Sequence, residues 1–369
     1  MNTLELLDRL VAFPTVSADT NLPLIDFVRS YLTDRGFECR LVPDGSGSKA
    51  NLFASIGPRG DDGILLSGHT DVVPAATQVW ASDPFRLTRH GTRLHGRGST
   101  DMKGFLASVL SVADRLDAAA LKRPLHIAFS HDEEIGCVGV RSLIDRLVAQ
   151  EFKAALCIVG EPTSMAVALG HKGKLAAQAR FRGEAGHSSL APRFVNAIHL
   201  ACDFVGVLRD EQRQIAATGI RDADYDIPYT TVHAGKIAGG DVLNIVAEHA
   251  RVDFEIRHLA EDDVDEILSR IRAAAGPETK IEIRNAYPGL STSGHSPAAA
   301  FARQLLGKAP TTKVSFGTEA GLFATRLRLE TVVIGPGSMD QGHQPDEYID
   351  EAELQRCDAM MDRLIERLS

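Results

Sequence analysis

The sequence of 369 residues is poor in cysteine. It has five cysteines, an odd number, and no two of them form a CxxC motif. A disulfide framework needs a higher density and an even count, so the sequence predicts none, and we expect the chain in a reducing cytoplasm. The cysteines are Cys39, Cys137, Cys157, Cys202 and Cys357.

Long apolar runs and clusters of basic residues are also missing. No apolar stretch approaches the roughly 18 residues that a transmembrane helix needs, and residues 1–5 lack the basic and apolar regions of a secretory signal. The net charge is −9, from 40 basic and 49 acidic residues, with no run of Lys or Arg to bind phosphates. We therefore expect a soluble chain with no membrane partner and no nucleic-acid partner.

What is present is ample apolar material in an alternating pattern. Hydrophobic residues make up 44% of the chain, near the average for globular proteins. Short apolar runs alternate with helical periodicity over 2–13, where Asn2 and Glu5 are spaced as a capping box, and over 103–118. This predicts an α/β fold with a mostly parallel sheet and helices on both faces. The expected buried strands are 64–67, 125–130, 156–159 and 331–334.

The middle of the chain has a different pattern. Apolar and polar residues alternate strictly in two segments, which indicates strands with one solvated face. Helical segments between the strands make the order βαββαβ, a compact antiparallel unit. We therefore expect a discontinuous domain of residues 1–172 and 287–369, with a second domain, 173–286, inserted into it. The expected elements of the insertion are strands over 175–182, 230–237, 250–257 and 280–284, and helices over 196–214 and 261–275.

Histidines and carboxylates follow the four expected buried strands. Ligands of open α/β sheets bind at the carboxyl ends of strands, so these side chains predict one site. Imidazole and carboxylate groups suit zinc or cobalt, and two divalent cations would neutralise the repulsion among the carboxylates. A carboxylate beyond the ligand set would serve as the base of a metal-assisted hydrolase. The residues are His69, Asp71, Asp132, Glu133, Glu134, Glu161 and His343, with Asp101 at the start of the 103–118 helix.

Each motif also has a simpler interpretation. The pair of His69 and Asp71 could be an ordinary surface pair, and Glu133 with Glu134 a solvated turn. Asp101 could be a partner of the helix dipole. The metal prediction therefore depends on the whole set.

Four motifs carry a family resemblance. Residues 67–74 (SGHTDVVP), 96–104 (GRGSTDMKG), 132–134 (DEE) and 160–162 (GEP) together resemble the M20 metallopeptidase family, over nearly the whole chain. Two further stretches are similar to the acetylornithine deacetylase branch of that family. They are residues 316–323 (FGTEAGLF) and 335–348 (GPGSMDQGHQPDEY).

The resemblance implies a centre of two divalent ions, Zn(II) or Co(II). Asp101 would bridge the ions. His69 and Glu161 would complete one site, and Glu134 and His343 the other.

Three further carboxylates have implied or possible roles near the ions. Glu133 would be the general base. Asp71 would hold His69, because a ligating imidazole usually donates its second N–H to a carboxylate. Glu319 is a candidate for selecting a cationic side chain, and a purely structural role is the alternative.

The inserted domain would act as a lid and as the surface of a homodimer. His187, in the stretch 183–189, would stabilise the oxyanion in the site of the partner subunit; the alternative is a histidine that caps the following turn. Asn244 and Arg257 would hold the substrate carboxylate, and the alternative for Arg257 is a surface salt bridge.

The implied reaction is removal of the acetyl group from a small-molecule N-acyl amino acid. N2-acetylornithine would give acetate and ornithine, a step in arginine biosynthesis. Another N-acyl-amino-acid deacylase, a succinyl-diaminopimelate desuccinylase-like enzyme and a metal dipeptidase are alternatives. A non-catalytic metal-dependent binding protein is a further alternative, but Glu133 argues against it, because a binder needs no base beside a filled ligand set.

Overall fold

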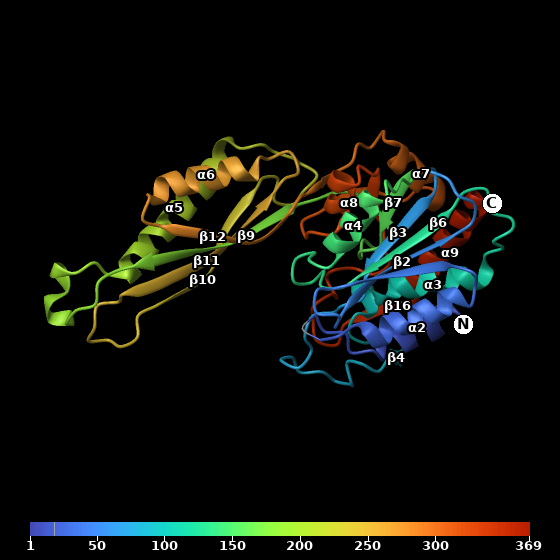
Figure 1. Cartoon of the computed structure of the whole chain (residues 1–369), viewed down its shortest axis with the longest axis horizontal. Coiled ribbons are helices and arrows are strands. Elements are labelled where there is room, and N and C mark those ends of the chain that lie inside the picture. Colours follow the sequence, from blue (N-terminus) through green and yellow to red (C-terminus); the bar gives the residue numbers. More distant parts are fainter. Residues whose placement is uncertain (18) are drawn as a thin grey trace. The chain divides into compact units, whose positions relative to one another are not determined.

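The computed structural model describes residues 1–17 and 19–369, which form two compact units (Figure 1). The first unit comprises Met1–Gly170, Leu290–Val314 and Thr318–Ser369. The second comprises His171–Gly289 and Ser315–Gly317, where the sequence predicts an inserted domain over 173–286. Within the described residues, no helix has the length and apolar character needed to cross a membrane.

The first unit is built on a mixed sheet, which has nine strands within the described residues. The strand order is β1-β2-β6-β3-β7-β15-β8-β13, and β14 pairs with β8. The four buried strands that the sequence predicts lie side by side at its centre as β6, β3, β7 and β15, and all three pairings among them are parallel. Antiparallel pairings flank this centre. The strands are β1 (Glu38–Pro43), β2 (Ala50–Ile56), β3 (Ile64–His69), β6 (Leu125–Ser130), β7 (Leu156–Val159), β8 (Val167–His171), β13 (Leu290–Ser291), β14 (Thr311–Val314) and β15 (Thr331–Val333).

Helices cover both faces of this sheet, as predicted. Alternate side chains such as Ile64 and Leu66 share a core with the helices of one face, and α4 and α8 pack together on the other (Figure 1). The predicted capping box of Asn2 and Glu5 starts α1. The first face carries α1 (Thr3–Val11), α2 (Leu22–Thr33), α3 (Gly104–Arg115), α7 (Pro297–Leu306) and α9 (Glu351–Leu368); the other carries α4 (Val140–Ala149) and α8 (Ala320–Arg326).

A small antiparallel sheet completes the first unit. Its order is β16-β5-β4, and it joins residues near position 90 to residues near position 349. The strands are β4 (Thr88–His90), β5 (Arg93–His95) and β16 (Tyr348–Asp350).

The second unit has the predicted βαββαβ order. Its antiparallel sheet runs β10-β11-β9-β12, and α5 and α6 lie side by side on one face of it (Figure 1). Apolar side chains such as Val252 and Phe254 point to those helices, so the alternation in the sequence marks the buried face correctly. The elements are β9 (Gly173–Arg182), α5 (Ala197–Thr218), β10 (Thr231–Gly239), β11 (His249–His258), α6 (Val264–Ala275) and β12 (Lys280–Tyr287).

Candidate metal centre

The carboxyl ends of the central parallel strands lie together, and the predicted side chains gather there. In the strand register His69, the last residue of β3, is opposite Ser130, the last residue of β6. Val159 at the end of β7 is opposite Val333 at the end of β15. The segments that leave these four ends therefore start from one edge of the sheet.

Asp101 lies between two histidines. His69 Nε2 is 3.1 Å from Asp101 Oδ1 and 3.7 Å from Glu161 Oε1. His343 Nε2 is 3.2 Å from the other Asp101 oxygen and 3.0 Å from Glu134 Oε2. The structure thus brings together all five predicted metal ligands, with Asp101 in the shared position.

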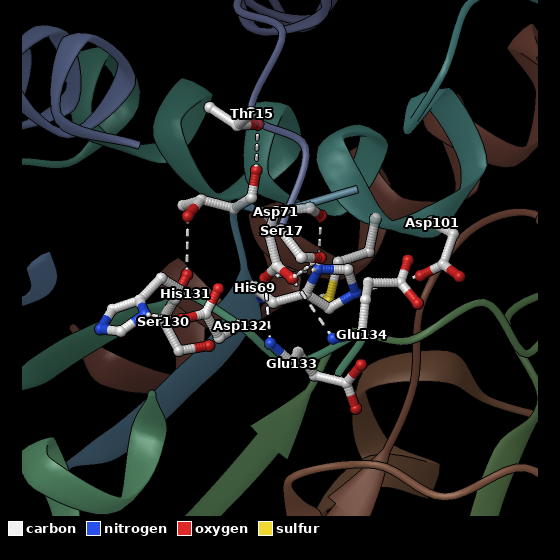
Figure 2. Close-up of polar contacts among 12 residues, drawn as sticks. Thr15, Ser17, His69, Asp71, Asp101, Ser130, His131, Asp132, Glu133 and Glu134 are labelled. Atoms are coloured by element: carbon white, nitrogen blue, oxygen red, sulfur yellow. Dashed lines mark hydrogen bonds and ion pairs between the residues drawn. The ribbon is translucent and has the colours of Figure 1, made fainter. Parts of the chain in front are cut away.

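The donor atoms are close enough to bind metal ions. In two groups, His69 with Asp101 and Glu134, and His69 with Glu133 and Glu161, the ligand atoms lie within 4.8 Å of one another. Figure 2 shows His69, Asp101 and Glu134 side by side. Glu134 Oε1 is buried and has no hydrogen-bond partner among the described residues. A buried, unpartnered carboxylate oxygen beside imidazole nitrogens fits a divalent cation such as zinc or cobalt.

Burial and mutual repulsion dominate the electrostatics of the glutamates. Burial raises the pKa of Glu134 to about 7, and the nearby Asp101 adds to this rise. Burial also raises the pKa values of Glu133 and Glu161 well above the usual range. Divalent cations would favour the ionised forms of these groups, because they supply the positive charge that compensates for lost hydration.

The pKa values of the two histidines also rise, but for an imidazole this rise favours the charged form. Hydrogen bonds to Asp101 and Glu134 raise the pKa of His343 to about 10. Burial lowers the pKa of His69, but Glu161 and Asp101 outweigh this effect and raise it well above its usual value. Burial would raise the pKa of Asp101, but hydrogen bonds from the two histidines outweigh it and lower the pKa below its usual range.

The side chain of Asp71 makes contacts that the sequence does not predict. His69 Nδ1 hydrogen-bonds to the main-chain oxygen of Asp71 at 2.8 Å, and the Asp71 carboxylate is 3.7 Å from that nitrogen. The carboxylate instead accepts the backbone N–H groups of Glu133 and Glu134 at 3.1 and 3.3 Å and the hydroxyl of Ser17 at 2.7 Å (Figure 2). The reason is that β3 ends at His69, so Asp71 does not continue the extended strand that would align the two side chains. Asp71 therefore orients His69 through its backbone and the acidic pair through its carboxylate.

A second buried carboxylate, for which the sequence predicts no role, holds the segment that carries Asp101. Glu347 accepts backbone N–H groups from Gly98, Thr100 and Asp101 at 3.0, 2.9 and 3.1 Å. Gly98 has φ of 80°, a conformation that favours glycine. Glu347 lies within the motif 335–348, but its partners are 246 to 249 positions away, so no local pattern reveals the contact.

Glu319 lies inside the first unit. It is 1% exposed, and its carboxyl accepts a hydrogen bond from the Ser130 hydroxyl at 2.6 Å. Burial raises its pKa to about 7. These contacts match the structural alternative for Glu319.

His187 and Asn244 lie close together in the second unit. His187 caps the turn Ser188–Arg193, since its Nδ1 accepts the backbone N–H of Ser189 at 3.2 Å. This is the capping alternative, and it leaves the proton of the neutral ring on Nε2, where it can be donated. The main-chain oxygen of Asn244 accepts the N–H of Ser188 at 3.0 Å.

Arg257 is on the polar face of β11. Its Nε is 3.0 Å from Glu255 Oε1, and its Nη1 donates to the Tyr287 hydroxyl at 3.2 Å. The salt bridge that the sequence leaves open is therefore present. It leaves part of the guanidinium fork for a further anion, because five N–H groups are available.

Comparison with known proteins identifies a matching family and relatives that cover nearly the whole chain. Residues 65–367 match the model of peptidase family M20/M25/M40. Acetylornithine deacetylase of Pasteurella multocida is 33% identical over 380 residues, covering 98% of this chain and 97% of that protein.

Solved structures share the fold. The M20 family metallo-carboxypeptidase Sso-CP2 from Sulfolobus solfataricus has a TM-score of 0.82 at 20% identity, covering 99% of both chains. The YXEP protein of Bacillus subtilis, a dinuclear metal binding peptidase from the M20 family, has a TM-score of 0.69 at 16% identity, covering 99% of this chain and 97% of that one.

Proposed function

The chain belongs to peptidase family M20/M25/M40, and from that premise we propose that it is a metal-dependent amidohydrolase that converts N2-acetylornithine into acetate and ornithine. The observation that supports this choice of substrate is the 33% identity to an acetylornithine deacetylase over 98% of the chain. The reaction would serve arginine biosynthesis in the cytoplasm.

Two divalent ions, Zn(II) or Co(II), would bind at the cluster around Asp101. His69 and Glu161 would hold one, Glu134 and His343 the other, and Asp101 would contact both. The buried carboxylates and the unpartnered oxygen of Glu134 support this assignment. When bound, such ions lower the pKa of water and polarise an acyl carbonyl.

Glu133 would be the general base. Its backbone N–H is held by Asp71, so its position depends on the same contact that places Glu134. Burial raises its pKa well above the usual range, which favours a group that accepts a proton from water and returns it to the leaving α-amine. Its thiol neighbour Cys137 contacts the carboxylate, with Sγ 3.3 Å from Oε1.

Residues of the second unit would bind the substrate. Arg257 would pair with the α-carboxylate, together with Asn244, because a guanidinium makes charge-assisted bonds to carboxylates. His187 would donate from Nε2 to the oxyanion. The capping bond at Nδ1 supports that tautomer.

A homodimer formed through the second unit would let His187 serve the partner's centre. Exposed apolar side chains on the segments that contain His187 and Asn244 support a covered surface there. They are Leu190, Val195, Val242, Leu243 and Ile245.

Acetate release from N2-acetylornithine tests the proposal. The chain is stripped with a chelator, reconstituted with Zn(II) or Co(II), and compared on N2-acetylornithine, N-acetylmethionine, N-succinyl-diaminopimelate and an Ala-Ala dipeptide. We expect the highest kcat/KM for N2-acetylornithine and no turnover without metal. A higher kcat/KM for the dipeptide or the succinyl compound would assign the chain to that activity instead.

A further inference from the structure

A buried arginine connects the two loops that carry Asp101 and His343. Arg97 is 1% exposed, and its Nη1 lies 2.8 Å from the carboxylate of Glu347. The same nitrogen is 3.3 Å from the main-chain oxygen of Gln344, the residue after His343. One side chain therefore contacts the carboxylate that fixes the Asp101 segment and the backbone beside His343.

A second connection reaches the backbone of His343 through Gln78. Arg97 Nη2 donates to the side-chain oxygen of Gln78, and Gln78 Nε2 donates to the main-chain oxygen of His343 at 2.8 Å. The Arg97 guanidinium also lies over the ring of Trp80, 4.9 Å from its centroid. Arg97, with its contacts to Gln78 and Trp80, thus stabilises the loop that contains His343 and Gln344, called the His343 loop below.

His343 needs such support more than His69 does. His69 ends a central strand, and its side chain is 1% exposed, whereas the side chain of His343 is 45% exposed. His343 has φ of 61°, a conformation that residues with a Cβ atom rarely adopt. Packing and the hydrogen bond to the main chain of Asp71 therefore fix His69, while polar contacts of the loop fix His343.

The Asp101 segment and Glu161 have anchors that do not involve Gln78. The three backbone N–H groups that donate to Glu347 do not involve Gln78. Glu161 follows β7, where the Gly160 N–H donates to the main-chain oxygen of Ser67 at 3.0 Å. Removing the Gln78 side chain therefore acts on the hydrogen bonds that hold the His343 loop, whereas removing Arg97 also leaves the buried Glu347 carboxylate without its cation.

We propose that Arg97, acting through Gln78 and the backbone of Gln344, is a positioning residue that sets the affinity of the Glu134–His343 site for its metal ion and leaves the His69–Glu161 site nearly unaffected. This inference rests on the assignment of ligands in the proposed function. Outer contacts of metal ligands typically change affinity about 10- to 100-fold when they are removed.

Titration of the metal-free, full-length chain with Co(II) tests it, with heat and visible absorbance as readouts. His343→Ala provides the reference for a chain that has lost the second site. We expect Gln78→Ala to bind the first ion within about threefold of the wild-type affinity and the second about 10- to 100-fold more weakly. Arg97→Met, which also leaves Glu347 without its cation, should weaken the second ion at least as much. The one-ion spectrum of each should match that of His343→Ala.

Gln78 is more exposed than Arg97, so Gln78→Ala keeps the test valid if Arg97→Met fails to fold. Arg270→Met is the matched control, because Arg270 pairs with the buried Glu211 at 2.7 Å in the second unit; it should bind both ions normally. Equal weakening of both ions in the Gln78 variant, or of neither, would overturn the proposal. A wild-type chain that binds two Co(II) ions but deacetylates nothing would refute the proposed function alone, and one that binds a single ion would refute both.

Discussion

Replacing Asp71 with asparagine should separate the roles of its backbone and its carboxylate. The main-chain oxygen that accepts His69 Nδ1 is unchanged by the substitution. The asparagine amide keeps one acceptor oxygen, but an NH₂ group replaces the other oxygen. One of the two backbone N–H groups then faces a donor where it now has an acceptor. The variant therefore disturbs the hydrogen bonds from the backbones of Glu133 and Glu134 while His69 keeps its orientation.

The magnitude follows from those two bonds. Hydrogen bonds to charged groups contribute about 1.5–3 kcal/mol each. At 3.1 and 3.3 Å both bonds are long, so the lower value applies to each. Asp71→Asn loses one of the two bonds and keeps the other as an uncharged one, so the cost is about 1.5–3 kcal/mol, which corresponds to roughly a 10- to 10²-fold loss of turnover if Glu133 is displaced from its position.

Acetate release at saturating Co(II) measures the effect as kcat, and metal analysis accompanies it. Ser17→Ala is the control, because it removes only the hydroxyl that donates to Asp71 and leaves both backbone bonds. We expect it to lose less than about tenfold. A wild-type kcat in Asp71→Asn, or an equal loss in Ser17→Ala, would show that the Asp71 carboxylate does not position the base.

Three further predictions concern pH, substrate binding and assembly. Burial lowers the pKa of His126 from 6.5 to about 4, so its neutral form stabilises the fold above pH 6.5 and this contribution is lost as the pH falls toward 4. It amounts to at most about 3 kcal/mol, and urea unfolding should depend less on pH in His126→Leu over that interval; an unchanged dependence would contradict the shift. Arg257→Ala should raise KM about 10-fold or more for N2-acetylornithine but not for its methyl ester, and equal increases would show a structural role. Glu133→Ala chains refolded together with His187→Ala chains should recover about a quarter of wild-type activity, and no recovery in proven mixed dimers would exclude action of His187 in the partner.

The central strands and the site at their ends were predictable because burial on both faces leaves a continuous apolar run. The start of β3, residues 64–66, and the whole of β7, Leu156–Val159, are such runs, and the side chains at their carboxyl ends lie at one edge of the sheet. The flanking strands Glu38–Pro43 and Ala50–Ile56 were not predicted. The first has a partly exposed, irregular pattern that carries no clear period, so only its pairing with the second reveals it.

The contacts that position the candidate ligands could not be predicted, because they join residues far apart in the sequence. Arg97 and Glu347 are 250 positions apart, and each alone is an ordinary charged residue that would normally be exposed. Their burial depends on β5 and β16 lying side by side, which neither short segment reveals. Likewise, the end of β3 at His69 decides which atom of Asp71 meets the imidazole.

Metal content and turnover, measured together on Glu133→Gln and Glu134→Gln, decide whether these neighbours are base and ligand. Glu133→Gln should retain two ions and lose about 10²–10⁴-fold in acetate release, because it removes a proton acceptor. Glu134→Gln should lose an ion, because it removes a charged ligand beside His343. Full turnover in Glu133→Gln, or metal loss in that variant with both ions retained in Glu134→Gln, would contradict a dinuclear centre with Glu133 as its base.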